Sequence, residues 1–191
     1  MNKKFDLLDI KLLQELQRDG RISITELAEN VNSSRLTVSR RLKRLFEEKL
    51  VIVRGGLNAN KMGFRMACVG LEAKGDMNRT EIENRLKGCP RIMNIFRTAE
   101  KANIHLAVWG EDDKTINSTI ESFRDIPNID LVYCHYLGSP IHGEIPIPIH
   151  STSYDVSPCG KICSNCYKYQ NEWCLGCPVT KYCKNPIIEK V

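Results

Sequence analysis

The feature that most limits how this chain can fold is a cluster of six cysteines near its end, in the spacing C-x3-C-x2-C-x7-C-x2-C-x5-C. They are Cys159, Cys163, Cys166, Cys174, Cys177 and Cys183. So short a segment cannot bury enough apolar surface to fold alone. Two thiolates separated by two residues can bind one metal ion from a tight turn, and the cluster contains two such pairs. The spacing therefore predicts a small cysteine-rich tail folded around metal.

The identity of this metal is limited by the residue types in the cluster. Residues 159–183 contain no histidine, so we expect thiolate ligands alone, which suit zinc or an iron-sulfur cluster. Closely spaced cysteine triplets recur in cluster proteins and favour iron-sulfur, with zinc as the alternative. Six thiolates exceed the four that one zinc ion or one cubane needs, so either two are spare or two metals share bridging sulfurs. A metal-free thiol-disulfide switch, and a zinc clip that serves only oligomer contacts, are further alternatives.

The first residues of the chain indicate the cellular compartment in which these thiols are found. The first ten residues, MNKKFDLLDI, are charged and lack the apolar region of a signal peptide. No apolar run approaches the roughly 18 residues of a membrane span. We therefore expect a cytoplasmic protein without membrane attachment, in which thiols stay reduced and clustered cysteines more often bind metal than form disulfides.

Three helices are predicted within residues 6–49. Leucines recur at helical intervals over residues 6–18 behind a possible Asp6 cap. Ser23 and Glu26 have the spacing of a capping box in front of a short second helix. A longer third helix spans residues 35–49, and the β-branched residues with Gly-Gly that follow indicate a small hairpin or wing.

The third helix is basic on the face that leaves the core. Helical geometry points Leu36, Thr37, Arg40, Lys43 and Arg44 away from Val38, Leu42, Leu45 and Phe46. No acidic residue occurs between Glu29 and Glu47, and residues 1–60 carry 12 Lys/Arg against 8 Asp/Glu. A tight turn followed by a basic helix predicts a helix-turn-helix over residues 24–49 that binds double-stranded DNA.

The candidate DNA contacts divide by what each side chain can reach. We expect Thr37, Arg40, Lys43 and Arg44 to meet base edges, because Arg and Lys suit the acceptors of guanine and Thr suits a thymine methyl. Side chains nearer the helix start or flank are expected to contact phosphate; these are Ser33, Ser34, Arg35 and Arg41. Ser33 or Ser34 could equally serve as a helix cap.

The middle of the chain alternates apolar strands with helical stretches in the order β-α-β-β-α-β. The expected elements are strands at 66–73, 91–98, 103–110 and 129–137 and helices at 79–88 and 113–125. This order is typical of a ferredoxin-like domain with two helices on one face of an antiparallel sheet. The open face would be covered by a second copy, so we expect a homodimer or a higher homo-oligomer. Cys68, Cys89 and Cys134 are expected to be ordinary core or half-buried residues.

Residues 5–137 resemble the Lrp/AsnC family of transcriptional regulators, most specifically in DGRISITELAENVNSS and RRLKRL. The resemblance implies a winged helix-turn-helix, a βαββαβ ligand-sensing domain, dimers, and a small effector, often an amino acid. The family's effector loop carries glycine and aspartate where this chain has Ala99 and Ala102. Glu100 and Asn103 are the candidate effector contacts in their place.

Together these observations predict an α+β protein in four parts. They are a winged helix-turn-helix DNA-binding domain (1–60), a ferredoxin-like sensing and dimerisation domain (61–137), a linker (138–158) and a cysteine-rich metal-binding tail (159–191). The function that follows is a sequence-specific, non-enzymatic regulator of transcription that responds to metal or redox state. The alternative is a haem-biosynthesis protein, because siroheme decarboxylases resemble the same family and residues 96–110 supply an Arg, a His and a Trp near one strand.

Overall fold

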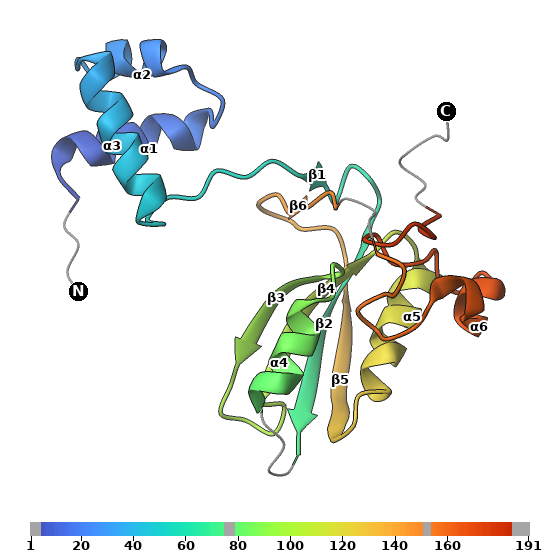
Figure 1. Ribbon diagram of the computed structural model, residues 1–191. Helices are drawn as coiled ribbons and strands as arrows, with labels where there is room; N and C mark the ends of the chain where they lie inside the picture. Colours follow the sequence, from blue (N-terminus) through green and yellow to red (C-terminus); the bar gives the residue numbers. More distant parts are fainter. Residues whose placement is uncertain (1–4, 75–78, 151–153, 185–191) are drawn as a thin grey trace. The chain divides into compact units, whose positions relative to one another are not determined.

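The computed structural model describes residues 5–74, 79–150 and 154–184. It divides into two compact units, Met1–Gly55 and Gly56–Val191. The α+β class and the order of elements agree with the prediction (Figure 1). The second unit contains the predicted linker and tail together with the predicted sensing domain, and residues 151–153 and 185–191 lie outside the described ranges.

The first unit contains the three predicted helices, α1 (Leu7–Arg18), α2 (Ile24–Asn30) and α3 (Arg35–Glu47). Each begins behind a polar N-cap whose side chain accepts a hydrogen bond from the backbone N–H three residues later; the caps are Asp6, Ser23 and Ser34. The turn before α3 contains Asn32 with a φ of 52°, a left-handed conformation that asparagine tolerates better than most residues. One apolar cluster holds the three helices together, and its buried members are Leu12, Leu27, Ala28, Val31 and Val38.

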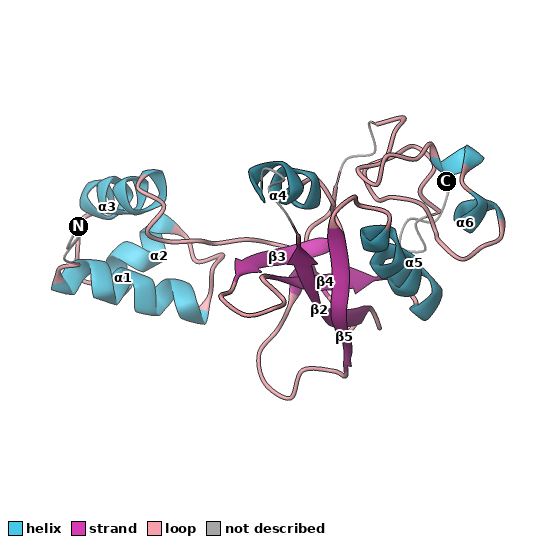
Figure 2. Cartoon of the chain, turned by 90° about the horizontal axis from the view of Figure 1, so that it is seen from below, coloured by secondary structure: helices cyan, strands magenta, loops and turns pink. Residues whose placement is uncertain are grey.

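The second unit contains the predicted β-α-β-β-α-β domain, called here the sheet domain. Its elements are β2 (Arg65–Ala73), α4 (Arg79–Lys87), β3 (Ile92–Arg97), β4 (Ile104–Gly110), α5 (Asp113–Arg124) and β5 (Ile129–Leu137). The four strands form one antiparallel sheet in the order β3-β4-β2-β5, and α4 and α5 pack against it (Figure 2). Ile82 and Leu86 of α4 and Ile116 and Ile120 of α5 share one core with the strands, so both helices cover the same face.

The region after α3 differs from the predicted wing. No helix or strand occurs between Val51 and Gly56. Instead β1 (Leu57–Asn58) pairs antiparallel with β6 (Pro146–Ile147), which lies in the predicted linker. A Cβ on Gly56 would lie 2.9 Å from the carbonyl oxygen of Ile147, so glycine permits the close approach of β6. Ile147 is completely buried, and the linker is therefore anchored to the second unit.

The cysteine tail contains little regular structure. Its elements are a 3-10 turn, η1 (Cys163–Asn165), and the short helix α6 (Tyr167–Gln170). Tyr154 forms an isolated parallel bridge with Thr180, and the backbone of Ser157 bonds to that of Lys161. These contacts fold the tail into a series of turns that bring its cysteines together.

The helices of the protein are short. The longest described ones, α1, α3 and α5, contain 12, 13 and 12 residues. A membrane-spanning helix needs about 20 apolar residues. In the described parts of the chain, no helix has the length and apolar character to cross a membrane.

Candidate DNA-binding helix and thiol cluster

The eight predicted DNA-contact residues lie on α3 and on the turn in front of it, and they differ in accessibility. Arg35, Arg40 and Lys43 are exposed, as is Ser34. The other four, Ser33, Thr37, Arg41 and Arg44, are half-buried. Ser34 is the N-cap of α3: its Oγ accepts from the backbone N–H of Thr37 at 3.1 Å and lies 2.8 Å from the Thr37 hydroxyl.

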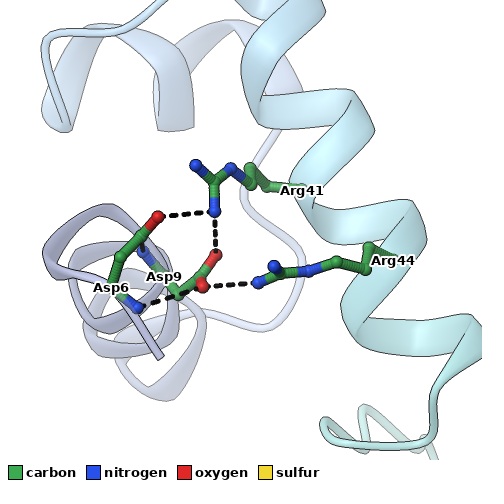
Figure 3. A network of polar contacts seen from close by, with 4 residues as sticks. All are labelled: Asp6, Asp9, Arg41 and Arg44. Atoms are coloured by element: carbon green, nitrogen blue, oxygen red, sulfur yellow. Dashed lines mark hydrogen bonds and ion pairs between the residues drawn. The ribbon is translucent and has the colours of Figure 1, made fainter. Parts of the chain in front are cut away.

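Arg41 and Arg44 point toward α1 and bind its first turn (Figure 3). Arg44 Nη2 lies 2.5 Å from Asp9 Oδ2, and Arg41 Nη1 lies 2.6 Å from Asp6 Oδ2 and 3.5 Å from Asp9 Oδ1. The Asp9 side chain is 1% exposed, so both guanidinium groups compensate a buried carboxylate. Arg44, predicted to read bases, therefore has its charged end engaged within the protein.

Asp9 has a second role at the start of α1. Its carboxylate accepts from the backbone N–H of Asp6, while the Asp6 carboxylate accepts from the backbone N–H of Asp9, which completes a capping box. The hydrogen bond from the Asp9 N–H, aided by the nearby Arg41, holds the pKa of Asp6 below its usual value. One small network thus fixes both the start of α1 and the rotation of α3.

The cations of α3 that remain available are Arg35, Arg40 and Lys43. In the described part of the chain, no carboxylate lies within ion-pair distance of Arg35 or Arg40. Lys43 lies 3.8 Å from Glu47, but both side chains are well exposed, so this pair contributes little. The helix therefore presents exposed positive charge to solvent, the kind of surface that attracts phosphate and base-edge acceptors.

Six thiols surround one cavity of about 300 Å³ in the second unit. Five come from the tail, namely Cys159, Cys163, Cys166, Cys174 and Cys177, and the sixth is Cys89. Cys89 is half-buried, as expected, and the sequence did not indicate that it lines the same cavity as the tail cysteines. Within the described ranges no three Cys, His, Asp or Glu side chains converge on one point as metal ligands do; the thiols line the cavity instead.

The remaining cysteines have other surroundings. Cys183 is half-buried and does not line the cavity. Cys134 is half-buried, as expected. Cys68 was also expected to be core or half-buried but is exposed, because its strand neighbours Ala67 and Val69 point into the core and Cys68 lies on the opposite face of the sheet. Only Cys134 of these two packs against the core of the sheet domain.

The pKa of two of these thiols depends on burial and on nearby backbone N–H groups. Burial has the largest effect on the pKa of Cys174 and Cys177, and the backbone of Gly176 and of Val179, in each case two positions later, opposes it. A nearby N–H group favours the thiolate, which is the form that binds metal. Gly176 adopts a φ of +87°, which lets the chain turn sharply between the two cysteines.

Burial acts in the opposite direction on the same groups. It raises the pKa of Cys177 to about 12 and that of Cys183 to about 11, and it also raises the pKa of Cys174 and Cys89. These four thiols are therefore protonated at neutral pH when they have no ligand. A metal ion that binds them must displace these protons, and its affinity rises with pH.

A buried ion pair lies beneath the tail. Arg91 and Glu111 form a salt bridge with side chains only 4% and 3% exposed. Arg91 Nη2 also donates to the carbonyl oxygen of Gly176 at 2.7 Å, and its guanidinium lies 5.4 Å from the centre of the Trp109 ring. Arg91 thus holds the turn between Cys174 and Cys177 against the sheet domain.

Helix α5 provides two further attachments for the tail. The backbone N–H of Leu175 donates to the Thr115 hydroxyl at 3.3 Å, and Lys168 Nζ donates to the carbonyl oxygen of Ser118 at 3.4 Å. Sequence reasoning missed Arg91, Glu111 and these α5 residues. No local pattern marks them, because their partners lie far away along the chain.

The two predicted effector contacts lie in the loop between β3 and β4. Glu100 is exposed. Asn103 accepts from the backbone N–H of Ala73 at 3.0 Å and donates to its carbonyl oxygen at 3.1 Å, so its amide ties the loop to the end of β2. This engagement leaves Asn103 less able to meet an effector than the sequence indicated.

The residues proposed for the enzymatic alternative are each bound to a different neighbour. Arg97 forms two hydrogen bonds of 2.6 Å with Glu83. The His105 ring lies 2.7 Å from the Tyr133 hydroxyl, and Trp109 is buried with its indole N–H donating to the carbonyl oxygen of Pro90. The three side chains do not form a common pocket among the described cavities.

Comparison with known sequences identifies relatives of this chain. Residues 5–45 match the model of the AsnC-type helix-turn-helix domain. The leucine-responsive regulatory protein of Rhizobium meliloti is 30% identical over 136 residues, which cover 68% of this chain and 86% of that protein. The transcriptional regulator LrpC of Bacillus subtilis is 23% identical over 145 residues, which cover 74% and 94% of the two chains. These relatives are transcriptional regulators, so the comparison gives no support to an enzyme.

Comparison with solved structures shows the same fold. The structure of Bacillus subtilis LrpC matches with a TM-score of 0.61 and 21% identity, and covers 73% of this chain and 98% of its own. The feast or famine regulatory protein from M. tuberculosis, complexed with L-methionine, matches with a TM-score of 0.66 and 20% identity. That match covers all of the neighbour but 76% of this chain, so about a quarter of this chain has no counterpart there.

Proposed function

The chain belongs to the Lrp/AsnC family of DNA-binding transcriptional regulators, and from this premise we propose that it reads DNA through the free cations of α3 and responds to a metal centre held by its cysteine tail. The observation that carries the first part is that the cations of α3 have different partners. Arg41 and Arg44 bind the buried Asp9, whereas Arg40 is exposed and Lys43 has only a solvent-exposed pair with Glu47.

In this proposal Arg40, Lys43 and Thr37 meet base edges in the major groove, and Arg35 and Ser33 contact phosphate at the start of the helix. Arg44 and Arg41 set the orientation of α3 on α1 instead of reading sequence. The assignment differs from one based on helical geometry alone, in which Arg44 shares the reading face.

The test uses DNA selected from a random library with the wild-type protein. Arg40→Ala and Lys43→Ala are each expected to lower affinity by about 1–3 kcal/mol, roughly 5- to 150-fold, without lowering the melting temperature. Arg21→Ala is the matched control, because Arg21 is a 93% exposed cation of the same unit outside α3. Equal affinities for Arg40→Ala and Arg21→Ala would refute the assignment.

We further propose that the protein acts as a homodimer through the open face of its sheet. Phe96, which is 57% exposed, pairs across the sheet with His105, whose neighbours Ile104 and Leu106 point into the core on the opposite face. An exposed aromatic on an open sheet face favours pairing with a second copy. Light scattering is expected to give at least twice the 21.8 kDa chain mass, and Phe96→Glu is expected to reduce it to one chain.

The metal part of the proposal rests on the chemistry of the donor set. Five cysteines of the tail line one cavity. This donor set suits a thiophilic centre, and a cavity of about 300 Å³ has room for a multi-atom cluster. We therefore favour iron-sulfur and keep zinc as the alternative; a brown sample after anaerobic purification supports the former, and a colourless sample with stoichiometric zinc supports the latter.

Sensing requires that the metal state favour one of two DNA-binding states of the dimer. Affinity for the selected DNA is to be measured by fluorescence anisotropy for the metal-loaded protein, the metal-free protein and a variant with all six tail cysteines changed to serine. A coupling of 1–3 kcal/mol would change affinity about 5- to 150-fold. Equal affinity for all three would remove the sensing role and leave DNA binding intact.

A further inference from the structure

We propose that Cys89 of the sheet domain binds the same metal centre as the tail cysteines, so that the centre connects the tail to the domain that precedes it. This inference rests on the proposed metal binding by the tail. It adds a ligand from another part of the chain, which no cysteine spacing within residues 159–183 indicates.

The first support is the position of Cys89. It lies in the turn between α4, which ends at Lys87, and β3, which begins at Ile92. The cavity lined by the five tail thiols is also lined by Cys89, and Cys89 and Cys159 together line a second, smaller cavity as well. When the ligands of one metal centre come from distant segments, the bound metal closes a long loop of the chain. Closing a longer loop removes more conformational entropy from the unfolded chain.

The second support is the turn that carries Cys89. The carbonyl oxygen of Cys89 accepts a hydrogen bond from the backbone N–H of Ile92, three residues later, at 3.1 Å. The carbonyl oxygens of Cys163 and Cys177 accept the same kind of bond from the third residue after them, at 3.0 and 2.9 Å. Three tight turns from two parts of the chain thus begin at a cysteine in the same way, as expected of ligands to one centre.

The third support is the arginine that follows Cys89. Arg91 is buried and donates to the carbonyl oxygen of Gly176, within the turn that joins Cys174 to Cys177. Its pairing with Glu111 fixes the guanidinium in place. The short segment 89–91 therefore carries the Cys89 thiol and also holds the turn from Cys174 to Cys177. One piece of backbone thus positions both Cys89 and this part of the tail.

The test compares Cys89→Ser with Cys68→Ser, because Cys68 is an exposed cysteine outside the cavity of the same unit. The full chain is loaded anaerobically with ferrous iron and sulfide or, separately, with Zn²⁺, and metal release to a chelator is followed. Cys89→Ser is expected to release metal at least about 10-fold faster than wild type, and Cys68→Ser at the wild-type rate. Loading with Co²⁺ adds a direct readout, since loss of one thiolate should weaken the sulfur-to-cobalt charge-transfer band by the share of one ligand.

A second measurement uses the wild-type chain and so does not depend on how a variant folds. Alkylation of each cysteine is quantified by mass spectrometry with and without bound metal. Cys89 is expected to be protected with metal and to react after chelation, while the reaction of Cys68 does not change.

The outcomes separate this inference from the proposed function. If Cys89→Ser retains metal like Cys68→Ser, or if metal leaves Cys89 alkylation unchanged, while the six-serine variant binds none, the inference is wrong and the tail site stands. If wild type takes up neither metal, both fail. If Cys89 is a ligand but DNA affinity is the same with and without bound metal, only the sensing role is lost.

Discussion

The helix-turn-helix unit and the cysteine tail are both short segments, and they are stabilised in different ways. The first unit has an apolar core of its own, built from Leu12, Leu27 and Val38 with their neighbours. In the tail, over residues 159–184, Cys163 is the one apolar side chain that is buried. The comparison teaches that a segment without a core must be held by attachments to another domain and by bound ligands.

The buried ion pairs of the two regions show the same difference. Asp9 is buried, but its partners Arg41 and Arg44 are 31% and 40% exposed. Arg91 and Glu111 are both nearly inaccessible to solvent. Removing one member of a fully buried pair leaves an uncompensated charge without water, so the second pair is the more sensitive to substitution.

The largest effect is expected from metal removal. Chelation should abolish the protection of residues 154–184 against hydrogen exchange, since binding energy of a thiolate site is also folding energy, while α1–α3 keep theirs. Exchange is measured by mass spectrometry on loaded and chelated protein. Unchanged protection of the tail would mean that its contacts with α5 and Arg91 are sufficient to hold it.

Arg91→Gln is expected to have the next largest effect, a loss of about 3–5 kcal/mol in the free energy of unfolding of the second unit, because Glu111 is left buried and unpaired. Both tryptophans of the chain, Trp109 and Trp173, belong to that unit, so urea unfolding followed by fluorescence reports on it. Arg65→Gln is the control: its pair with Asp113 is 52% and 73% exposed, and about 0.5 kcal/mol or less is expected. Equal losses would contradict the ranking of the two pairs.

Asp9→Asn tests the corresponding network of the first unit. We expect a loss of about 1–3 kcal/mol, less than for Arg91→Gln, because water can reach Arg41 and Arg44. Thermal melting followed by circular dichroism measures it. Arg40→Ala should leave the melting temperature unchanged while lowering DNA affinity. If instead Arg40→Ala lowered the melting temperature and Asp9→Asn lowered only DNA affinity, the stabilising role of Asp9 and the DNA-binding role of Arg40 would both be wrong.

The smallest effect is expected for the difference between alanine substitutions at two glycines of the tail. Gly160 and Gly176 both have left-handed backbones, with φ of +81° and +87°, so alanine at either is expected to cost about 1–2 kcal/mol. A Cβ at Gly176 would also lie 2.9 Å from the carbonyl oxygen of Tyr182, whereas at Gly160 it meets nothing within 4 Å. Gly176→Ala should therefore release metal faster than Gly160→Ala, and equal rates would show that the close approach at Gly176 relaxes freely.

The sequence by itself determined the local elements of this protein. The periodicity of apolar residues gave α1, α2, α3 and the six elements of the sheet domain within a residue or two, because 3.6- and 2-residue repeats follow from local backbone geometry. The polar caps Asp6 and Ser23 fixed where helices begin, for the same local reason.

Only the tertiary structure decided which side chains of those elements remain available. Helical spacing placed Arg44 with Arg40, but Asp9, far away along the chain, binds Arg44 and leaves Arg40 free. Likewise Cys89 joined the tail thiols, and β6 replaced the predicted wing by pairing with β1. Spacing records only neighbours along the chain, whereas a buried charge, a shared cavity or a strand partner depends on residues that come together after folding.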